Sequence, residues 1–234
     1  MISRKQLDGC EDCRECMNRA PYFQILSPQE LEVINRDRYS LRYKAGEMIL
    51  KQGTSATHVL SLIDGIVKIY IEGIGDKNLL LSLQKPWALL GGPGVHTDRK
   101  IHYSVAALTG VSICFIDIEN FNKVMHINCR FANQLIGHIS SQSVILFDKM
   151  VSLTQKQMHG RMADGLLYLS KDFYDSESFD MHLSRQEIAD ITAMSKDSAI
   201  RILKDFERDG IIRLQGSKIS ILDADQLNDI SLKG

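Results

Sequence analysis

The chain has 234 residues, of which 44% are hydrophobic and 24% are charged, and it contains only four prolines. This composition excludes a disordered chain and a fibrous repeat, and the length predicts two domains of ordinary size. The formal net charge of −1 does not exclude nucleic acid as a partner, because a local basic surface is enough to contact phosphates.

The first 20 residues are polar and rich in cysteine. Cys10, Cys13 and Cys16 form a C-x2-C-x2-C pattern and are three of the five cysteines in the chain. Crowded thiols and an odd cysteine count are typical of a reducing compartment. No apolar segment typical of an export signal precedes them, and no window approaches the roughly 18 apolar residues that span a bilayer. We therefore expect a soluble, cytoplasmic protein that does not enter a membrane.

Residues 43–118 consist of short β-rich runs separated by glycine and other turn residues. Regular short strands of this kind predict a small barrel or roll. The pair Asp64 and Gly65, between two apolar runs, predicts a hairpin because glycine adopts positive φ at low cost. The predicted strands are residues 47–50, 58–63, 66–72, 78–83, 103–108 and 111–116.

A long segment without proline, residues 129–158, follows the roll. Its apolar residues recur at spacings of four, seven, four and three, which is the pattern of one helix face. That face could pack on its own domain or form a coiled-coil seam between two subunits. We favour the seam, because the helix is longer than one small barrel can cover and Gln142 takes the remaining seam position. The predicted dimer interface is Leu135, Ile139, Leu146, Met150 and Leu153.

The last third of the chain begins with a predicted helix at about residues 160–173 and an acidic, polar loop at 174–180. Ser184 and Glu187 then form a capping box, the signature of a helix N-terminus. The box opens a predicted helix at residues 185–192.

A second helix follows after a short turn. Ser195 caps it, it covers residues 196–209, and Gly210 ends it. Two apolar runs, residues 211–214 and 218–222, then form a predicted hairpin. Helix, short turn, helix and hairpin is the order of a winged helix-turn-helix.

In a helix-turn-helix, the first residues of the second helix meet base edges in the major groove. Asp197 and Arg201 are four apart and share one face, where Arg can bridge guanine O6 and N7 and the carboxylate can accept from cytosine N4. The two could instead form an intrahelical ion pair, but the preceding capped helix and the following hairpin favour DNA. Residues 195–218 carry six basic and four acidic side chains, so useful affinity requires two heads binding together. The predicted DNA-contacting residues are Ser184, Arg185, Lys196, Asp197, Ser198, Arg201, Lys204 and Lys218.

Residues 183–189, LSRQEIA, and 194–204, MSKDSAIRILK, closely resemble the recognition motif of the cyclic AMP receptor protein and FNR family of transcription regulators. In that family a Glu and an Arg four residues apart read a G-containing half-site. Arg201 matches the Arg, whereas Asp197 replaces the Glu with a shorter side chain.

The resemblance covers nearly the whole chain, since residues 43–47 resemble the family's β-roll and residues 129–158 its dimerisation helix. It implies a homodimer on a pseudo-palindromic double-stranded DNA site, with RNA polymerase as a further partner. The implied α+β architecture is a cysteine-rich arm at 1–20, a cyclic-nucleotide-binding-like β-roll sensor domain at 21–127, a dimerisation helix at 128–158 and a winged helix-turn-helix DNA-binding domain at 159–234.

The obvious ligand of such a roll is a cyclic nucleotide, whose phosphate needs an arginine and oriented donors. Residues 89–95 and 101–104 lack the family's Gly-Glu and Arg-Ser/Thr phosphate signature. Ile101 and His102 stand at the positions of the last pair, and Arg99 is out of register. We therefore do not expect cyclic AMP or cyclic GMP to bind.

The cysteines predict a different cofactor. Three closely spaced thiolates can ligate one cubane, as in the bacterial ferredoxin run, and Cys114 resembles the distant cluster ligand of oxygen-sensing FNR proteins. We predict a 4Fe-4S cluster through which oxygen or nitric oxide controls DNA affinity. Cys129 is the reserve fourth ligand, and the spacing from Cys13 to Cys16 is shorter than in the enteric pattern. The predicted ligands are Cys10, Cys13, Cys16 and Cys114.

Three alternatives remain open at this point. The N-terminal thiols could hold zinc or cycle between thiol and disulfide. An apolar pocket lined by Trp87, Tyr103 and Phe115 could bind a small effector. The histidines show no H-E-x-x-H spacing and there is no nucleophile elbow, so we expect no enzyme, and a cupin-like metalloenzyme is the remote alternative.

Overall fold

A computed structural model describes residues 20–234. Within that range no helix combines the length and the apolar character needed to cross a bilayer. The three N-terminal cysteines of the predicted cluster lie outside the described residues: Cys10, Cys13 and Cys16.

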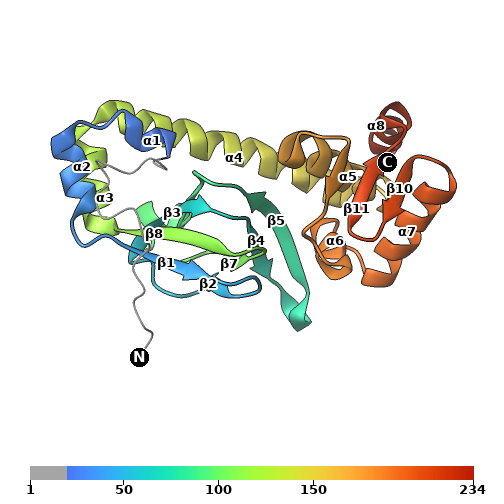
Figure 1. The fold of residues 1–234 in the computed structure, drawn as a ribbon, viewed down its shortest axis with the longest axis horizontal. Helices are drawn as coiled ribbons and strands as arrows, with labels where there is room; N and C mark the ends of the chain where they lie inside the picture. Colours follow the sequence, from blue (N-terminus) through green and yellow to red (C-terminus); the bar gives the residue numbers. More distant parts are fainter. Residues whose placement is uncertain (1–19) are drawn as a thin grey trace. The chain divides into compact units, whose positions relative to one another are not determined.

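The chain divides into two compact units. The first contains the chain up to Glu72 together with Ser82–Gln142, and the second contains Gly73–Leu81 together with Ser143–Gly234. One helix, α4 (Cys129–Gln155), contributes residues to both units (Figure 1). It ends three residues before the predicted helix does.

Two four-stranded sheets form the β-roll that the sequence predicts. Their orders are β1-β8-β3-β6 and β2-β7-β4-β5. In the first sheet all neighbouring strands are antiparallel, and in the second β7 is antiparallel to both β2 and β4. Two of the strands were not predicted: β1 has Leu41 as its one aliphatic residue, and β6 is too short to show a period. The strands are β1 (Tyr39–Tyr43), β2 (Met48–Leu50), β3 (His58–Asp64), β4 (Val67–Glu72), β5 (Asn78–Gln84), β6 (Leu89–Leu90), β7 (Ser104–Ala107) and β8 (Val111–Asp117).

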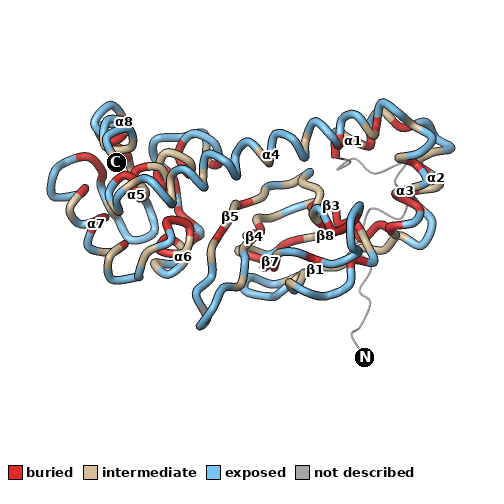
Figure 2. Tube along the Cα trace, turned by 180° about the vertical axis from the view of Figure 1, so that it is seen from behind, coloured by how far each residue is buried: buried red, intermediate tan, exposed pale blue. Residues whose placement is uncertain are grey.

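Three helices that the sequence analysis did not predict accompany the roll. They are α1 (Pro21–Gln24), α2 (Pro28–Asn35) and α3 (Ile118–Ile127). A capping box of Ser27 and Glu30 opens α2, so a usable sequence signal was present. The helices and the start of α4 enclose one apolar cluster (Figure 2). Its members include Phe23, Leu31, Ile34, Cys114, Ile116, Phe121, Val124, Phe131 and Leu135.

The second unit contains the predicted winged helix-turn-helix and two elements that were not predicted. Residues 174–180, expected to be only a loop, include β9, which pairs with β11 and makes the wing a three-stranded sheet of order β10-β11-β9. The C-terminal helix α8 was also missed. The elements are α5 (Met158–Leu167), the π-helical turn η3 (Tyr168–Tyr174), β9 (Ser178–Asp180), α6 (Arg185–Ile191), α7 (Lys196–Arg208), β10 (Ile212–Gln215), β11 (Lys218–Ile221) and α8 (Ala224–Lys233).

A polar network attaches α8 to the rest of this unit. Asp164 of α5 accepts hydrogen bonds from Lys156 Nζ at 2.9 Å, from Ser231 Oγ at 2.5 Å and from Ser152 Oγ at 2.5 Å. The carboxylate therefore links the end of α4, the helix α5 and the helix α8. A half-buried charge with three donors of this kind fixes helix positions more than an exposed ion pair does.

Candidate nucleic-acid interface

The turn between α6 and α7 is built by side chains that bond to the backbone. Thr192 is buried, and its Oγ1 donates to the carbonyls of Ile188 and Ala189 at 2.8 and 3.2 Å. Ala193 follows with a left-handed φ of 49°, and Arg161 Nη1 donates to its carbonyl at 3.1 Å. These bonds fix the direction in which α7 leaves the turn.

Helix α7 is anchored by one face and presents the other. Ser195 caps it, because its Oγ accepts a hydrogen bond from Ser198 N at 3.2 Å. The opposite, exposed side carries Lys196, Asp197 and Lys204, and Arg201 is exposed beside them. The anchoring face consists of the buried residues Ala199, Ile202, Leu203 and Phe206.

Asp197 and Arg201 are both exposed, and their side chains form no ion pair with each other in the described part of the chain. They line a shallow concavity together with Ile200, Lys204 and Asp205. The intrahelical ion pair considered from the sequence is therefore absent, and both polar groups face the concavity. A donor and an acceptor four residues apart can contact the two bases of one G·C pair or of neighbouring pairs.

The wing is joined directly to α7. Glu207 Oε1 accepts a hydrogen bond from Leu214 N at 3.0 Å, and Gly216, at a φ of 63°, makes the tight turn between β10 and β11. Lys218 is exposed at the start of β11. Arg208, one of the six basic residues of this segment, is instead occupied by Asp205 and Asp209 at 2.9 and 3.1 Å.

The remaining predicted DNA-contacting residues differ in how far they are presented. Ser184 is exposed and caps α6, with Oγ accepting from Glu187 N at 3.3 Å. Arg185 is half-buried and its Nη1 is buried without a hydrogen-bond partner. Ser198 is half-buried beside the Ser195 cap, with the two hydroxyls 2.9 Å apart. These three residues therefore have structural roles or partial shielding in addition to any contact with DNA.

The two described cysteines lie in different environments. Cys114 is buried at 6% exposure on β8, and Arg38 Nη1 donates to its Sγ at 3.4 Å. Cys129 is exposed at the first residue of α4. Among residues 20–234, no three side chains of the metal-binding types gather at one point.

The residue that the resemblance aligns with the family's phosphate-binding arginine is apolar. Ile101, at the position of the family's arginine, is buried at 2% and belongs to the apolar cluster. A Cβ on Gly92 would lie 2.7 Å from the ring of Tyr103, whose hydroxyl accepts a hydrogen bond from Gly91 N at 3.1 Å. Whether cyclic nucleotide binds stays a prediction from the sequence.

The three aromatic residues proposed to line an effector pocket lie in different environments. Trp87 is 52% exposed, whereas Phe115 is buried and stacks on Tyr39 with ring centroids 4.9 Å apart. Tyr103 packs against Gly92. Residue type, on which the proposed pocket was based, does not indicate the direction of a side chain.

A β-roll followed by a long helix and a winged helix-turn-helix with a polar recognition face defines a DNA-binding transcription regulator. The model of the cyclic nucleotide-binding domain matches residues 40–128, and the model of the Crp-like helix-turn-helix domain matches residues 160–230. The chain belongs to the Crp/Fnr family, whose members are transcription regulators and not enzymes.

Relatives and solved structures agree with this membership over most of the chain. The transcriptional activator protein FnrA of Stutzerimonas stutzeri is 22% identical over 222 residues, covering 92% of this chain and 89% of that protein. The transcriptional activator protein anr of Pseudomonas aeruginosa is 24% identical over 224 residues, covering 93% and 90%. The structure of FixK2 from Bradyrhizobium japonicum has a TM-score of 0.75 at 18% identity, covering 82% of this chain and 96% of that one, which shows a shared fold.

Proposed function

We propose that this regulator acts in the cytoplasm as a homodimer that binds a pseudo-palindromic DNA site and works with RNA polymerase. In this proposal Asp197 and Arg201 of α7 read base edges in the major groove. The observation that carries it is their exposure, without pairing to each other, on a helix whose opposite face is buried. Contacts to phosphates and sugars would come from Ser184, Arg185, Lys196, Ser198, Lys204 and Lys218.

The test of base reading is the variant Arg201→Ala. Arg201 is exposed, so the variant keeps its stability and loses about 1 to 3 kcal/mol of specific binding, with relaxed selection at one base pair. Selection of binding sites from a random duplex library measures both effects. The matched control is Arg42→Ala, an exposed arginine on β1, which should select the wild-type site. Unchanged selection by R201A would show that α7 reads DNA through other residues.

We also propose that α4 forms the seam between the two subunits. Four of the five predicted interface residues have the required exposure: Ile139 and Met150 are 50% and 62% exposed, Leu146 is 40% exposed, and Leu153 is half-buried. Leu135 does not fit, because it is 5% exposed and packs in the apolar cluster of its own unit. Exposed Ile136 and Phe147 extend the same helix face.

For the effector we propose a 4Fe-4S cluster held by Cys10, Cys13, Cys16 and Cys114, responsive to oxygen or nitric oxide. The environment of Cys114 fits a ligand: it is buried, and the Arg38 guanidinium donates to its Sγ. A cationic donor favours the thiolate, which is the form of cysteine that binds metals. The names of FnrA and anr as transcriptional activators are in keeping with an FNR-like branch.

When bound, the cluster would supply an oxidisable group that holds the N-terminal arm to the roll. The chain offers a connection from that arm to the seam. Tyr22 of α1 and His138 of α4 are joined by a hydrogen bond of 3.1 Å between Oη and Nδ1, with their rings edge to face at 5.5 Å. Burial raises the pKa of Tyr22 and lowers that of His138, so this contact stays neutral and directional at physiological pH. Movement of the arm would thereby reach the residue next to Ile139.

Anaerobic purification tests the cluster. We expect a brown protein that contains iron and sulfide and absorbs at about 400 nm. This absorbance should be lost in air. Cys114→Ser should lose the iron, whereas Cys129→Ser, which alters the exposed cysteine of α4, should keep it. If Cys129→Ser loses the iron and Cys114→Ser keeps it, the fourth ligand is Cys129 and not Cys114. A colourless anaerobic protein that contains zinc would show that the site binds zinc and not an iron-sulfur cluster.

A further inference from the structure

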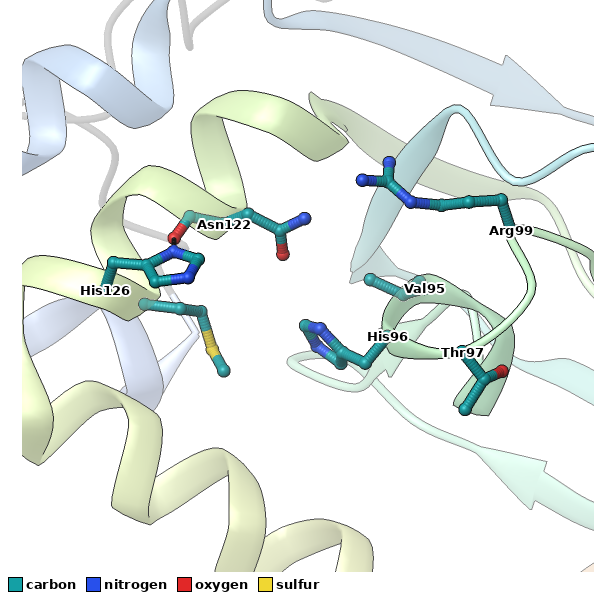
Figure 3. A pocket seen from close by; sticks show the side chains of 7 residues that line it. Val95, His96, Thr97, Arg99, Asn122 and His126 are labelled. Atoms are coloured by element: carbon teal, nitrogen blue, oxygen red, sulfur yellow. Dashed lines mark hydrogen bonds between the residues drawn. The ribbon is translucent and has the colours of Figure 1, made fainter.

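A concavity of about 490 Å³ opens on the first unit, and neither Cys114 nor Cys129 lines it. It lies between the loop after β6 and the helix α3 (Figure 3). Its volume is in the range of sites for small ligands. It is lined by Val95, His96, Thr97, Arg99, Asn122, Met125 and His126.

The polar side chains of this concavity are mainly donors and cations. The guanidinium of Arg99, the amide of Asn122 and the ring of His96 point into the gap between loop and helix (Figure 3). His126 Nδ1 is 2.6 Å from the carbonyl oxygen of Asn122, which makes Nδ1 the donor and leaves Nε2 for another partner. Val95 and Met125 add an apolar wall.

The acidic groups nearby are already engaged. Glu119 of α3 pairs with Arg99 at 2.9 Å, although both side chains are about half exposed. Asp98 accepts from His102 Nε2 at 3.0 Å and from Lys100 N at 3.1 Å. One arginine and two histidine rings therefore line the concavity, and Glu119 is a carboxylate partner of the arginine. A bound anion would be a further partner for this guanidinium.

The backbone holds Arg99 in place for this role. Its φ is 60°, a left-handed conformation that non-glycine residues seldom adopt. Arg99 N donates to Gly94 O at 2.9 Å, and Arg99 O accepts from Ala56 N at 2.7 Å. Gly94 is essential to the loop because a Cβ there would lie 1.6 Å from Lys100 O. Strain that the surrounding structure maintains in this way is found at ligand sites more than elsewhere.

We propose that this concavity is a binding site for a small oxyanion, carried as a carboxylate or a phosphate on a small molecule. Arg99 supplies the permanent charge, Asn122 a neutral donor, and His96 a proton that anion binding retains, while the ring of His126 lines the same concavity. Burial, followed by the charges of Arg99 and His126, lowers the pKa of His96. A bound anion reverses that effect, so binding strengthens as the pH falls.

The test uses the full-length protein in a buffer free of phosphate and carboxylate, titrated separately with inorganic phosphate and with succinate. Histidine ring resonances, assigned with His96→Gln and His126→Gln, report binding. We expect saturable shifts at both rings, a rise in the pKa of His96 and several-fold tighter binding at about pH 6 than at about pH 7.5. The tighter of the two probes identifies the ligand as a phosphate or a carboxylate.

The variant Arg99→Gln should weaken binding by roughly tenfold or more, since a hydrogen bond to a charged group is lost, and His96→Gln should remove the pH dependence. Arg42→Gln, an exposed arginine on β1, is the matched control and should bind as the wild type does. Absence of saturable shifts with both probes, or equal binding by R99Q and the wild type, overturns the proposal. These outcomes do not depend on the cluster or on α7, because the histidine resonances report anion binding and not DNA binding.

Discussion

Ala193, in the turn between α6 and α7, is a single residue whose backbone conformation suits glycine better than alanine. Its φ of 49° is left-handed, which costs a residue with a Cβ roughly 1 to 2 kcal/mol. Replacement by glycine removes that strain but increases the entropy of the unfolded chain. The balance sets the first prediction.

We expect Ala193→Gly to stabilise the protein by about 0.5 to 1 kcal/mol, which raises Tm by a few degrees. Thermal and urea unfolding measure the change. The control is Ala132→Gly, inside α4, which should lose about 1 kcal/mol because glycine is unfavourable within a helix. A loss of stability in A193G would mean that the turn depends on the methyl group of Ala193.

At the scale of single residues, the sequence predicts features that depend only on residues nearby in the chain, such as helix caps. Both helix caps of the DNA-binding unit, Ser184 and Ser195, are found with the predicted bonds. Features set by distant residues were not predictable. In the sequence Arg208 is one of the basic residues available to DNA, yet in the structure it forms ion pairs with Asp205 and Asp209. Leu135 was predicted to lie at the dimer interface, although it is buried within its own unit.

At the element scale, α4 shows that the period of an apolar pattern does not by itself decide which apolar residues stay exposed. One residue turns the direction of a side chain by about 100°. The predicted seam runs from Leu135 to Leu153, whereas the exposed apolar face is centred nearer Ile136 and Phe147. The helical period is visible in the sequence. The packing of Leu135 in the apolar cluster decides which apolar residues of the helix remain exposed.

Lys149, on the same helix, makes an unusual contact. Its Nζ donates to Leu80 O at 2.7 Å and to Leu81 O at 3.3 Å on β5. Burial lowers the pKa of Lys149 to about 8, so its folded pKa lies below that of the unfolded chain. Above about pH 8 the unfolded chain therefore binds more protons at Lys149 than the folded protein does. The contribution of this group to the free energy of unfolding increases as the pH rises.

We therefore expect the wild type to gain about 1 to 2 kcal/mol relative to Lys149→Met between about pH 7 and about pH 9.5. Urea unfolding of both proteins at several pH values measures the difference. The control for removal of a lysine is Lys68→Met, at a half-buried residue of β4 whose Nζ lies over the ring of Tyr70. If the stability of K149M and of the wild type changes with pH in the same way, folding does not lower the pKa of Lys149.

At the scale of the whole molecule, the proposed seam predicts the oligomeric state. A charge in place of an exposed apolar residue should repel the second subunit, since both copies carry it at the same interface. We expect Phe147→Glu, at a residue that is 63% exposed, to yield folded monomers with DNA affinity reduced at least tenfold because two heads no longer bind together.

Light scattering and titration of a palindromic duplex measure these two effects. Ile127→Glu is the matched control, because Ile127 is 64% exposed at the end of α3. If F147E remains dimeric while I127E dissociates, the subunits meet through another surface.

The order of the larger parts, a roll, a long helix and a winged helix-turn-helix, was predictable because each has a strong local pattern. Helices α1 to α3, the strand β9 and the helix α8 were not predicted. β9 is three residues long and exists because it pairs with β11, a partner about 40 residues away. Short elements of this kind are defined by their contacts, which a periodic pattern does not contain.

The third strand of the wing has a practical consequence. Because β11 is hydrogen-bonded on both sides, the exposed tip at Gly216 and Ser217 extends from a sheet that is firmer than an isolated hairpin. A fluorescent group attached at Ser217 by thiol-independent chemistry would tumble with the domain rather than on its own. The fluorescence anisotropy of this group would then rise when the protein binds a duplex, so binding could be measured without a label on the DNA.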